Sequence, residues 1–138
     1  MHSRPARLVL FGEGPLETAL RAFADELGIS RHVLFPGYVN DPSACYARAD
    51  LFVLSSTSEG FGNVLIEAMA AGVPVVSTDA PHGPREILAD GRFGPLVPVG
   101  NAEALAAALD RPIAADRLRK RAADFEIAKI GDRYDALL

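Results

Sequence analysis

Short apolar runs rich in β-branched residues alternate with helical patterns along this chain. The predicted strands are 7–12, 32–37, 51–56, 74–78 and 95–99. The predicted helices are 15–28, 43–49, 63–72, 84–89 and 101–110. Alternation of this kind is typical of a parallel sheet with helices on both faces, because each parallel connection needs a crossover. The pattern therefore predicts an α/β fold.

The residues that flank the predicted helices agree with these boundaries. Pro15 suits a first helical position, where its missing N–H is not needed. Gly28 and Gly72 suit the left-handed position that follows many helices, and Asn101 suits an N-cap. Local sequence and hydrophobic pattern thus predict the same elements.

Composition and charge narrow the class of protein. The chain has 138 residues, of which 49% are hydrophobic and 23% charged, so it is long enough for one domain with a core and is not a disordered chain. Its net charge is −4, which argues against general nucleic-acid binding. The one basic block, 117-RLRKR-121, predicts a solvated face of a late helix, with contact to a membrane surface as the alternative.

The single cysteine and the lack of long apolar segments indicate a compartment. Cys45 excludes an internal disulfide and a cysteine metal site, and we expect it to be a small buried apolar residue. The apolar run near residue 7 is too short for a signal peptide, and no segment reaches about 18 apolar residues. These features predict a cytoplasmic protein.

The stretch 57-TSEGFGNVLIEAMAAG-72 is the strongest candidate for chemistry. It follows a predicted strand and opens an apolar, buried-looking helix, so its glycine-containing loop falls at the carboxyl end of a parallel strand. Backbone N–H groups near Phe61, Gly62 and Asn63, together with the helix dipole, favour a bound phosphate.

Two carboxylates accompany this loop. Glu67 lies four residues after Asn63, about 6 Å further along the helix axis. The same stripe continues to the small Ala70 and Ala71, which leaves room for a polyhydroxylated ligand, and a carboxylate binds a vicinal diol well. Alternatively, Glu59 is an exposed loop residue and Glu67 only interacts favourably with the helix dipole.

Five motifs carry a resemblance to a known family. They are S-x-E-G-F-G-N-V-L-I-E-A-M-A-A-G-V-P-V-V, 10-LFGEGPLETAL-20, 35-FPGYVND-41, 49-ADLFVLSS-56 and 79-DAPHGPREIL-88. In this order and spacing they resemble the C-terminal, donor-binding domain of the group 1, or family 4, retaining glycosyltransferases. The resemblance implies the GT-B fold, in which two Rossmann-like domains face a cleft. It covers roughly residues 7 to 110 and implies a nucleotide-sugar-binding domain at 1–110, followed by a helical tail at 111–138.

The resemblance also implies roles for individual residues. Glu67 would bind the ribose hydroxyls of a nucleotide-sugar donor. Glu59, the first glutamate of the E-x7-E pattern, would contact the donor sugar and help to stabilise an oxocarbenium-like transition state. Backbone groups of Phe61, Gly62 and Asn63 would hold the sugar and the diphosphate.

Further expectations concern the base and the cofactor. Main chain around Tyr38 and Val39 would face the nucleobase. The nucleoside-diphosphate sugar would be a substrate, and no cofactor or metal is expected, since enzymes of this fold usually neutralise the diphosphate with a helix dipole and basic side chains. The three histidines are scattered and no D-x-D motif occurs, which also argues against a metal site.

Two other segments allow two interpretations each. In 81-PHGPREI-87, His82, Arg85 and Glu86 follow a strand end and are candidates for the cleft rim, or else ordinary surface residues. In 12-GEGPLE-17 the glycines and the proline predict a strand-to-helix turn, with phosphate contact as the alternative. A dinucleotide fingerprint fails there, because Glu17 stands where the third glycine belongs.

The resemblance further predicts what this sequence lacks. The N-terminal acceptor domain and the first strand and helix of the donor domain, with their Arg/Lys pair, have no counterpart here. A gap would then separate the strands at 7–12 and 51–56, and an unpaired edge favours homo-oligomerisation. The implied function is sugar transfer from a nucleoside-diphosphate sugar to a glycan or lipid-linked acceptor in surface polysaccharide synthesis, with peripheral membrane contact of the full enzyme. A fragment that is inactive alone fits these features, and the alternative is a stand-alone nucleotide-sugar-binding module or a non-catalytic remnant.

Overall fold

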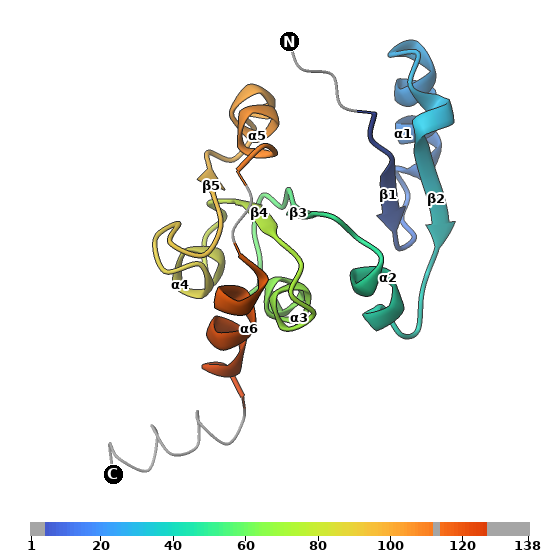
Figure 1. Ribbon diagram of the computed structural model, residues 1–138. Helices are drawn as coiled ribbons and strands as arrows, with labels where there is room; N and C mark the ends of the chain where they lie inside the picture. The colour runs from blue at the N-terminus through green and yellow to red at the C-terminus, as the bar shows by residue number, and fades with distance from the viewer. Residues whose placement is uncertain (1–4, 112–113, 127–138) are drawn as a thin grey trace. The chain divides into compact units, whose positions relative to one another are not determined.

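The computed structural model describes residues 5–111 and 114–126 (Figure 1). The chain forms two compact units, residues 1–42 and 43–138. Both are built from parallel strands and helices in alternation, as the hydrophobic pattern predicts. Residues 127–138 of the predicted tail lie outside the described residues.

The first unit contains one parallel strand pair and its crossover helix. Its elements are β1 (Leu8–Phe11), α1 (Glu17–Glu26), the 3-10 helix η1 (Ser30–His32) and β2 (Val33–Gly37). Leu8 pairs with Val33, and the register shifts before Phe11. Gly28 has φ +68°, which confirms the left-handed residue predicted after α1.

The start of α1 differs from the prediction. The helix begins at Glu17, two residues after Pro15, because the Gly14 carbonyl accepts the Glu17 amide in a turn that precedes the first helical residue. The segment 12–17 therefore forms a strand-to-helix turn. Gly12, with φ +110°, allows the chain to leave β1 and donates its amide to the Gly37 carbonyl at 2.9 Å.

Most of the exposed large hydrophobic side chains among the described residues belong to this first unit. They include Leu8, Val9, Phe11, Leu16, Leu20, Phe23, Leu27, Ile29, Leu34 and Tyr38. Within the described part of the chain, β1 pairs only with β2, and β3 of the second unit pairs only with β4. Within the described residues the two sheets thus share no strand pair.

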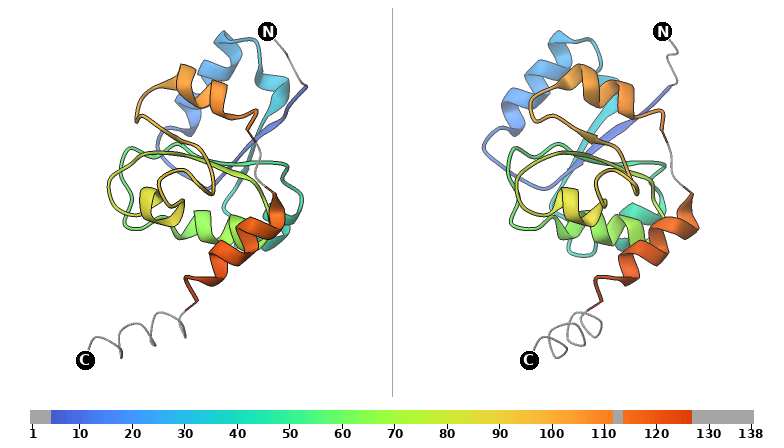
Figure 2. Two further views of the ribbon diagram at one scale, coloured as in Figure 1. Left: turned by 60° about the vertical axis from the view of Figure 1, so that its left-hand side comes forward. Right: turned by 90° about the vertical axis from the view of Figure 1, so that its left-hand side faces the viewer.

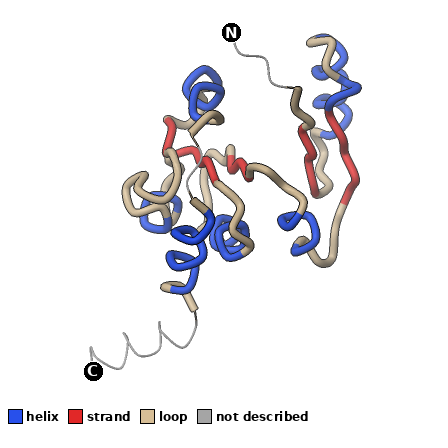
Figure 3. Tube along the Cα trace, viewed as in Figure 1, coloured by secondary structure: helices blue, strands red, loops and turns tan. Residues whose placement is uncertain are grey.

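The second unit has a three-stranded parallel sheet in the order β3-β4-β5 (Figure 3). Its strands are β3 (Phe52–Leu54), β4 (Val75–Thr78) and β5 (Leu96–Val97). Its helices are α2 (Ser43–Ala47), α3 (Asn63–Ala70), α4 (Pro84–Ile87), α5 (Ala102–Ala108) and α6 (Ala115–Ala123). Asn101 caps α5 by accepting the Ala104 amide at 2.9 Å, which confirms the predicted N-cap.

Helices cover both faces of this sheet (Figure 1). All four residues of the central strand β4 are buried, as is expected of a strand covered on both sides. Val75 packs in a cluster with residues of α3, α4 and α6, whereas its neighbour Val76 packs with Ala108 of α5. Because successive side chains of a strand point to opposite faces, this division confirms the predicted three-layer arrangement.

The helix α6 is part of the larger core. Leu118 is fully buried among residues of α3 and α4, and α6 lies beside α3 in both views of Figure 2. The prediction that 117-RLRKR-121 is only a solvated face is therefore wrong for two residues. Besides the buried Leu118, Arg121 donates to the carbonyls of Glu86 and Ile87 at the end of α4, at 2.6 and 2.9 Å. Its aliphatic stem and planar head allow it to pack while it satisfies these carbonyls.

Cys45 also differs from expectation. It is a free thiol and is half-buried rather than fully buried. On the short helix α2 the buried position is taken by the next residue, Tyr46. Tyr46 and not Cys45 is the residue of α2 that belongs to the buried core cluster.

Candidate functional site

The glycine-containing loop lies at the carboxyl end of β3, where the sequence predicts a ligand site. A side chain of β4 holds the start of this loop, because the Thr78 hydroxyl donates a hydrogen bond to the Ser56 carbonyl at 2.6 Å. Gly62 has φ +94°, a conformation that favours glycine, and is the N-cap residue of α3. The first N–H groups of any helix lack partners within it, so the start of α3 presents backbone donors at this loop.

Glu59 is held within this loop. It is half-buried, not an exposed loop residue as in the alternative interpretation. One of its carboxylate oxygens, Oε1, accepts a short hydrogen bond from the hydroxyl of Ser56. The carboxylate therefore has a preferred orientation, and its second oxygen is available to another donor.

Glu67 lies on the outer side of α3. Leu65 and Met69 on the inner side are fully buried, whereas Asn63, Glu67 and Ala70 are exposed. The predicted stripe of Asn63, Glu67 and the small alanines therefore lies on the solvent-exposed side of the helix. The helix is apolar because its inner side packs in the core, and Glu67 does not have to be buried within it.

The sequence did not point to the partner of Glu67. The Tyr46 hydroxyl of α2 donates to Oε2 of Glu67 at 2.9 Å. Burial raises the pKa of Tyr46 above its ordinary value, and the hydrogen bond with Glu67 raises that pKa further. The aromatic residue within 43-SACYARA-49 was the only sequence signal for this contact, and nothing local linked it to a residue 21 positions later.

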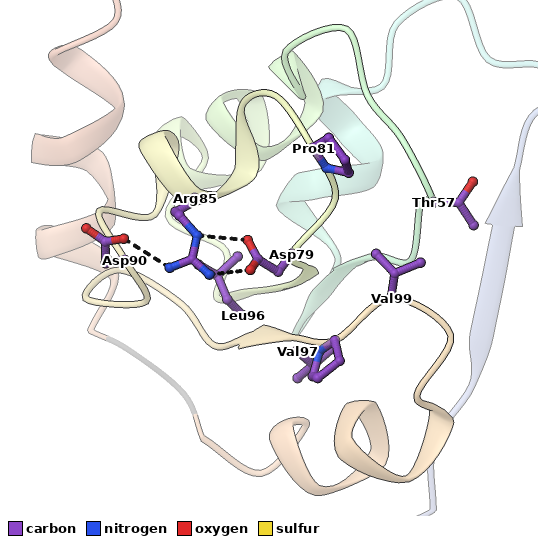
Figure 4. A pocket seen from close by; sticks show the side chains of 9 residues that line it. Thr57, Asp79, Pro81, Arg85, Asp90, Leu96, Val97 and Val99 are labelled. Atoms are coloured by element: carbon purple, nitrogen blue, oxygen red, sulfur yellow. Dashed lines mark hydrogen bonds and ion pairs between the residues drawn. The ribbon is translucent and has the colours of Figure 1, made fainter.

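A pocket of about 720 Å³ opens at the carboxyl ends of the strands of the second unit (Figure 4). It is lined by Thr57, Asp79, Pro81, Arg85, Asp90, Leu96, Val97, Pro98 and Val99. Arg85 forms ion pairs with both Asp79 and Asp90, the second at 3.2 Å. The hydrogen bonds with Asp79, and then the one with Asp90, raise the pKa of Arg85. Arg85 therefore lies at a pocket, with its charge balanced by two carboxylates.

The segment after β4 reaches back to the glycine-containing loop. His82 is exposed and has φ +65°, and Gly83 has φ +115°. A Cβ atom at Gly83 would lie only 1.6 Å from the carbonyl oxygen of Phe61. Main chain after β4 is thus in close contact with main chain of the candidate site.

The remaining predicted residues occupy other positions. The side chain of Glu86 is exposed, while its backbone carbonyl binds Arg121. Tyr38 and Val39 belong to the first unit, where they follow β2; Tyr38 is 70% exposed and Val39 is half-buried. The site described above is built from residues of the second unit alone.

The described residues show neither a metal-binding cluster nor a membrane-spanning helix. Among residues 5–111 and 114–126, no group of three or more His, Cys, Asp or Glu side chains is arranged to hold a metal ion. In the same residues, no helix combines the length and the apolar character needed to span a membrane.

Comparison with known proteins agrees with the motif pattern. Residues 2–127 match the family described as Glycosyl transferases group 1. The chain belongs to the group 1 glycosyltransferases. This match includes most of both units and the whole candidate site, so Glu59 and Glu67 lie inside the region that matches the family.

Individual relatives support this assignment. The lipopolysaccharide core biosynthesis glycosyltransferase LpsE of Rhizobium meliloti is 40% identical over 117 residues, covering 85% of this chain and 34% of the relative. The structure of the lipopolysaccharide outer core galactosyltransferase WaaB, in its apo form, matches with a TM-score of 0.84 at 25% identity, over 94% of this chain and 39% of that one. The structure of Anabaena Alr3699/HepE in complex with UDP matches with a TM-score of 0.82 at 26% identity, over 96% and 40%.

Two conclusions follow from these matches. The fold matches part of the GT-B glycosyltransferase structures, which confirms the predicted α/β class and the predicted family. This glycosyltransferase chain spans about a third of the length of the curated relative LpsE.

Proposed function

We propose that this chain supplies the donor-binding site of a retaining glycosyltransferase. The observation that carries the proposal is the arrangement around α3. A glycine-containing loop at the carboxyl end of β3 opens the helix, one oriented carboxylate lies in the loop, and a second lies on the exposed side of the helix. The HepE structure, which has a similar fold, is in complex with UDP, and this supports a nucleotide as the ligand.

Each part of the donor has a partner in this proposal. The diphosphate lies against the amides of Gly62 and Asn63, where the positive end of the α3 dipole favours an anion. The ribose hydroxyls bind Glu67. The contact of the nucleobase with main chain around Tyr38 and Val39 stays a prediction from the family resemblance. Recognition of a diol by a carboxylate is the same device that acidic residues of dinucleotide-binding folds use.

The available hydrogen-bond donors favour the start of α3 over Arg85 as the diphosphate site. Arg85 already pairs with Asp79 and Asp90, so this cluster carries a net negative charge and would repel a diphosphate. Glu59 and Glu67 also lie near the start of α3, but the first backbone N–H groups of that helix have no acceptor within the helix and can donate to an anion. We therefore assign His82, Arg85 and Glu86 to the rim of the cleft and not to the phosphate contact.

The reaction transfers a glycosyl group. The bond between the anomeric carbon and the phosphate oxygen breaks, and a new bond forms from that carbon to the oxygen of an acceptor hydroxyl. The acceptor hydroxyl passes its proton to the phosphate oxygen of the leaving nucleoside diphosphate. Positive charge develops on the sugar ring as the first bond breaks. Glu59, fixed by Ser56, contacts the sugar hydroxyls and stabilises this charge. In this scheme the donor is a substrate and no cofactor takes part.

The remaining parts of the proposal concern the whole enzyme. Because LpsE acts in lipopolysaccharide core biosynthesis, we assign this chain to the synthesis of surface polysaccharides on a glycan or lipid-linked acceptor. The same proposal includes a separate acceptor domain, a cytoplasmic location and peripheral membrane contact of the full enzyme. It also includes the pairing of two copies of the chain through the free edge of β1 or β3. The chain alone is expected to transfer little or no sugar.

Calorimetry tests donor binding. The 138-residue chain is titrated with UDP, GDP, ADP and the corresponding nucleotide sugars, and the titration is repeated with Glu67→Ala and Glu103→Ala. Glu103 is an exposed glutamate in the first turn of α5 and is the matched control. We expect Glu67→Ala to weaken binding about 10- to 100-fold, as for hydrogen bonds to a charged group, and Glu103→Ala to leave it unchanged.

The same titration separates the two classes of function. Binding without sugar transfer to any acceptor supports a donor-binding part, either of a longer enzyme or as a module of its own. Adding a separately produced acceptor domain then distinguishes these two, since only the first gains activity. If the wild-type chain binds none of these ligands, the proposed function is wrong.

A further inference from the structure

Tyr46 is deeply buried although its hydroxyl reaches a surface carboxylate. The residue lies on α2 and is 8% exposed. Its ring contacts the ring of Phe52 on β3 edge to face, with 5.6 Å between the centroids and 74° between the planes. It belongs to the same core cluster as Leu65 and Met69 of α3. Packing on the sheet and on α3 therefore fixes the place of the ring.

Because the ring is fixed, its hydroxyl group restricts the orientation of the Glu67 side chain. It donates to Oε2 at 2.9 Å, while the rest of the Glu67 side chain is exposed on α3. A glutamate on a helix surface otherwise samples several rotamers, and ordering a free glutamate opposes ligand binding by the entropy of those rotamers. The bond to Tyr46 removes much of that freedom before any ligand arrives.

The geometry leaves Glu67 able to bind a diol. A carboxylate has two oxygens with about four lone-pair sites, and Tyr46 uses one of them. Oε1 and the remaining lone pair of Oε2 are left for two neighbouring hydroxyls. The raised pKa of Tyr46 supports this direction of the bond, because the phenol keeps its proton and donates it over the whole physiological pH range.

We infer that Tyr46 is a positioning residue for the ligand: it holds the Glu67 carboxylate ready to accept hydrogen bonds from the ribose hydroxyls of a nucleoside diphosphate. This inference rests on the proposed function, since it concerns how the same site recognises its donor. Tyr46 itself touches no ligand in this arrangement and acts only through Glu67. This role differs from a purely structural one. A phenylalanine at position 46 would fill the same space in the core but would lack the hydroxyl that holds Glu67.

The test uses Tyr46→Phe in the full chain, with UDP and 2′,3′-dideoxy-UDP as the probes. The substitution keeps the ring on Phe52 and removes only the hydroxyl. We expect the affinity for UDP to fall about 3- to 10-fold, the size of one lost orienting hydrogen bond. The affinity for the dideoxy compound should stay within about twofold of wild type, because that ligand has no hydroxyls for Glu67 to recognise.

A double-mutant cycle with Glu67→Gln gives the second readout. Once the carboxylate is replaced, removing the Tyr46 hydroxyl should weaken UDP binding no further, so the two effects are not additive. Thermal unfolding of each variant checks that the fold is intact.

Three outcomes overturn the inference. Equal affinity of Tyr46→Phe and wild type for UDP excludes positioning, and equal losses for UDP and its dideoxy analogue indicate a structural role. In both cases the proposed function survives. If the wild-type chain binds neither compound, nor the other nucleoside diphosphates, the proposed function fails and this inference fails with it.

Discussion

Replacing Gly83 by alanine should separate two loops that meet at the candidate site. Gly83 has φ +115°, and a Cβ atom there would lie 1.6 Å from the carbonyl oxygen of Phe61 and 2.4 Å from its carbonyl carbon. Because both neighbours are backbone atoms, no side-chain rotation relieves the contact. Cβ atoms essentially never approach another heavy atom within 3.0 Å, so the main chain after β4 or the loop before α3 must shift by more than an ångström.

The expected loss of stability has two contributions. A non-glycine residue held in such a conformation costs about 1–3 kcal/mol. Overpacking against a fixed neighbour costs typically about 1–3 kcal/mol more. Partial relaxation of the loops lowers the sum, so we expect Gly83→Ala to reduce the free energy of unfolding by about 2–4 kcal/mol. For a chain of this size this lowers Tm by roughly 8–16 °C.

Thermal unfolding followed by circular dichroism measures this loss, with Gly60→Ala as the matched control. Gly60 lies in the same loop, and a Cβ atom there would have no heavy atom within 4 Å. Its substitution should change the unfolding free energy by no more than about 0.5 kcal/mol. A Gly83→Ala variant that unfolds at the same temperature as Gly60→Ala would refute the close approach of the two loops.

Three further predictions concern stability. Arg121→Ala should lower the free energy of unfolding by about 2–4 kcal/mol, because two carbonyls at the end of α4 lose their donor, whereas Lys120→Ala, its exposed neighbour, should change it by less than about 0.5 kcal/mol in urea unfolding. Asn101→Ala should cost about 1 kcal/mol in the same assay through loss of the α5 cap; no loss would contradict the cap. The third prediction is a pH dependence. The raised pKa of Tyr46 stabilises the fold below about pH 10, where an unfolded tyrosine is protonated, and this stabilisation should decrease as the pH rises further. Its slope should reach about 1.4 kcal/mol per pH unit and be absent in Tyr46→Phe; equal pH dependence of the two proteins would contradict it.

Elements with a strong local signal were predictable from sequence. The run at 74–78 is apolar and β-branched, and the structure has a strand there that is buried on both faces. Asn101 combines a good capping side chain with an alanine-rich helix, and it caps that helix. In each case one stretch of chain determines the outcome through its own propensity and periodicity.

Contacts between distant segments were not predictable in the same way. The pairing of Tyr46 with Glu67 depends on how α2 packs beside α3, and the binding of Arg121 to the α4 carbonyls joins residues about 35 positions apart. The sequence around Gly83 indicates a turn, but only the packing of the loop on Phe61 excludes a Cβ atom there. Periodicity describes which side of a helix is apolar and not which neighbour it meets.

The measurement that tests the central claim most directly is an amide NMR map of the chain titrated with UDP. The proposal predicts that the largest chemical-shift changes occur at the amides of Phe61, Gly62 and Asn63, and that Glu67→Ala weakens the titration without moving its location. Chemical-shift changes centred instead on Asp79 and Arg85 would contradict the assignment of the diphosphate to the start of α3. A spectrum that UDP, GDP and ADP all leave unchanged would contradict donor binding by this chain.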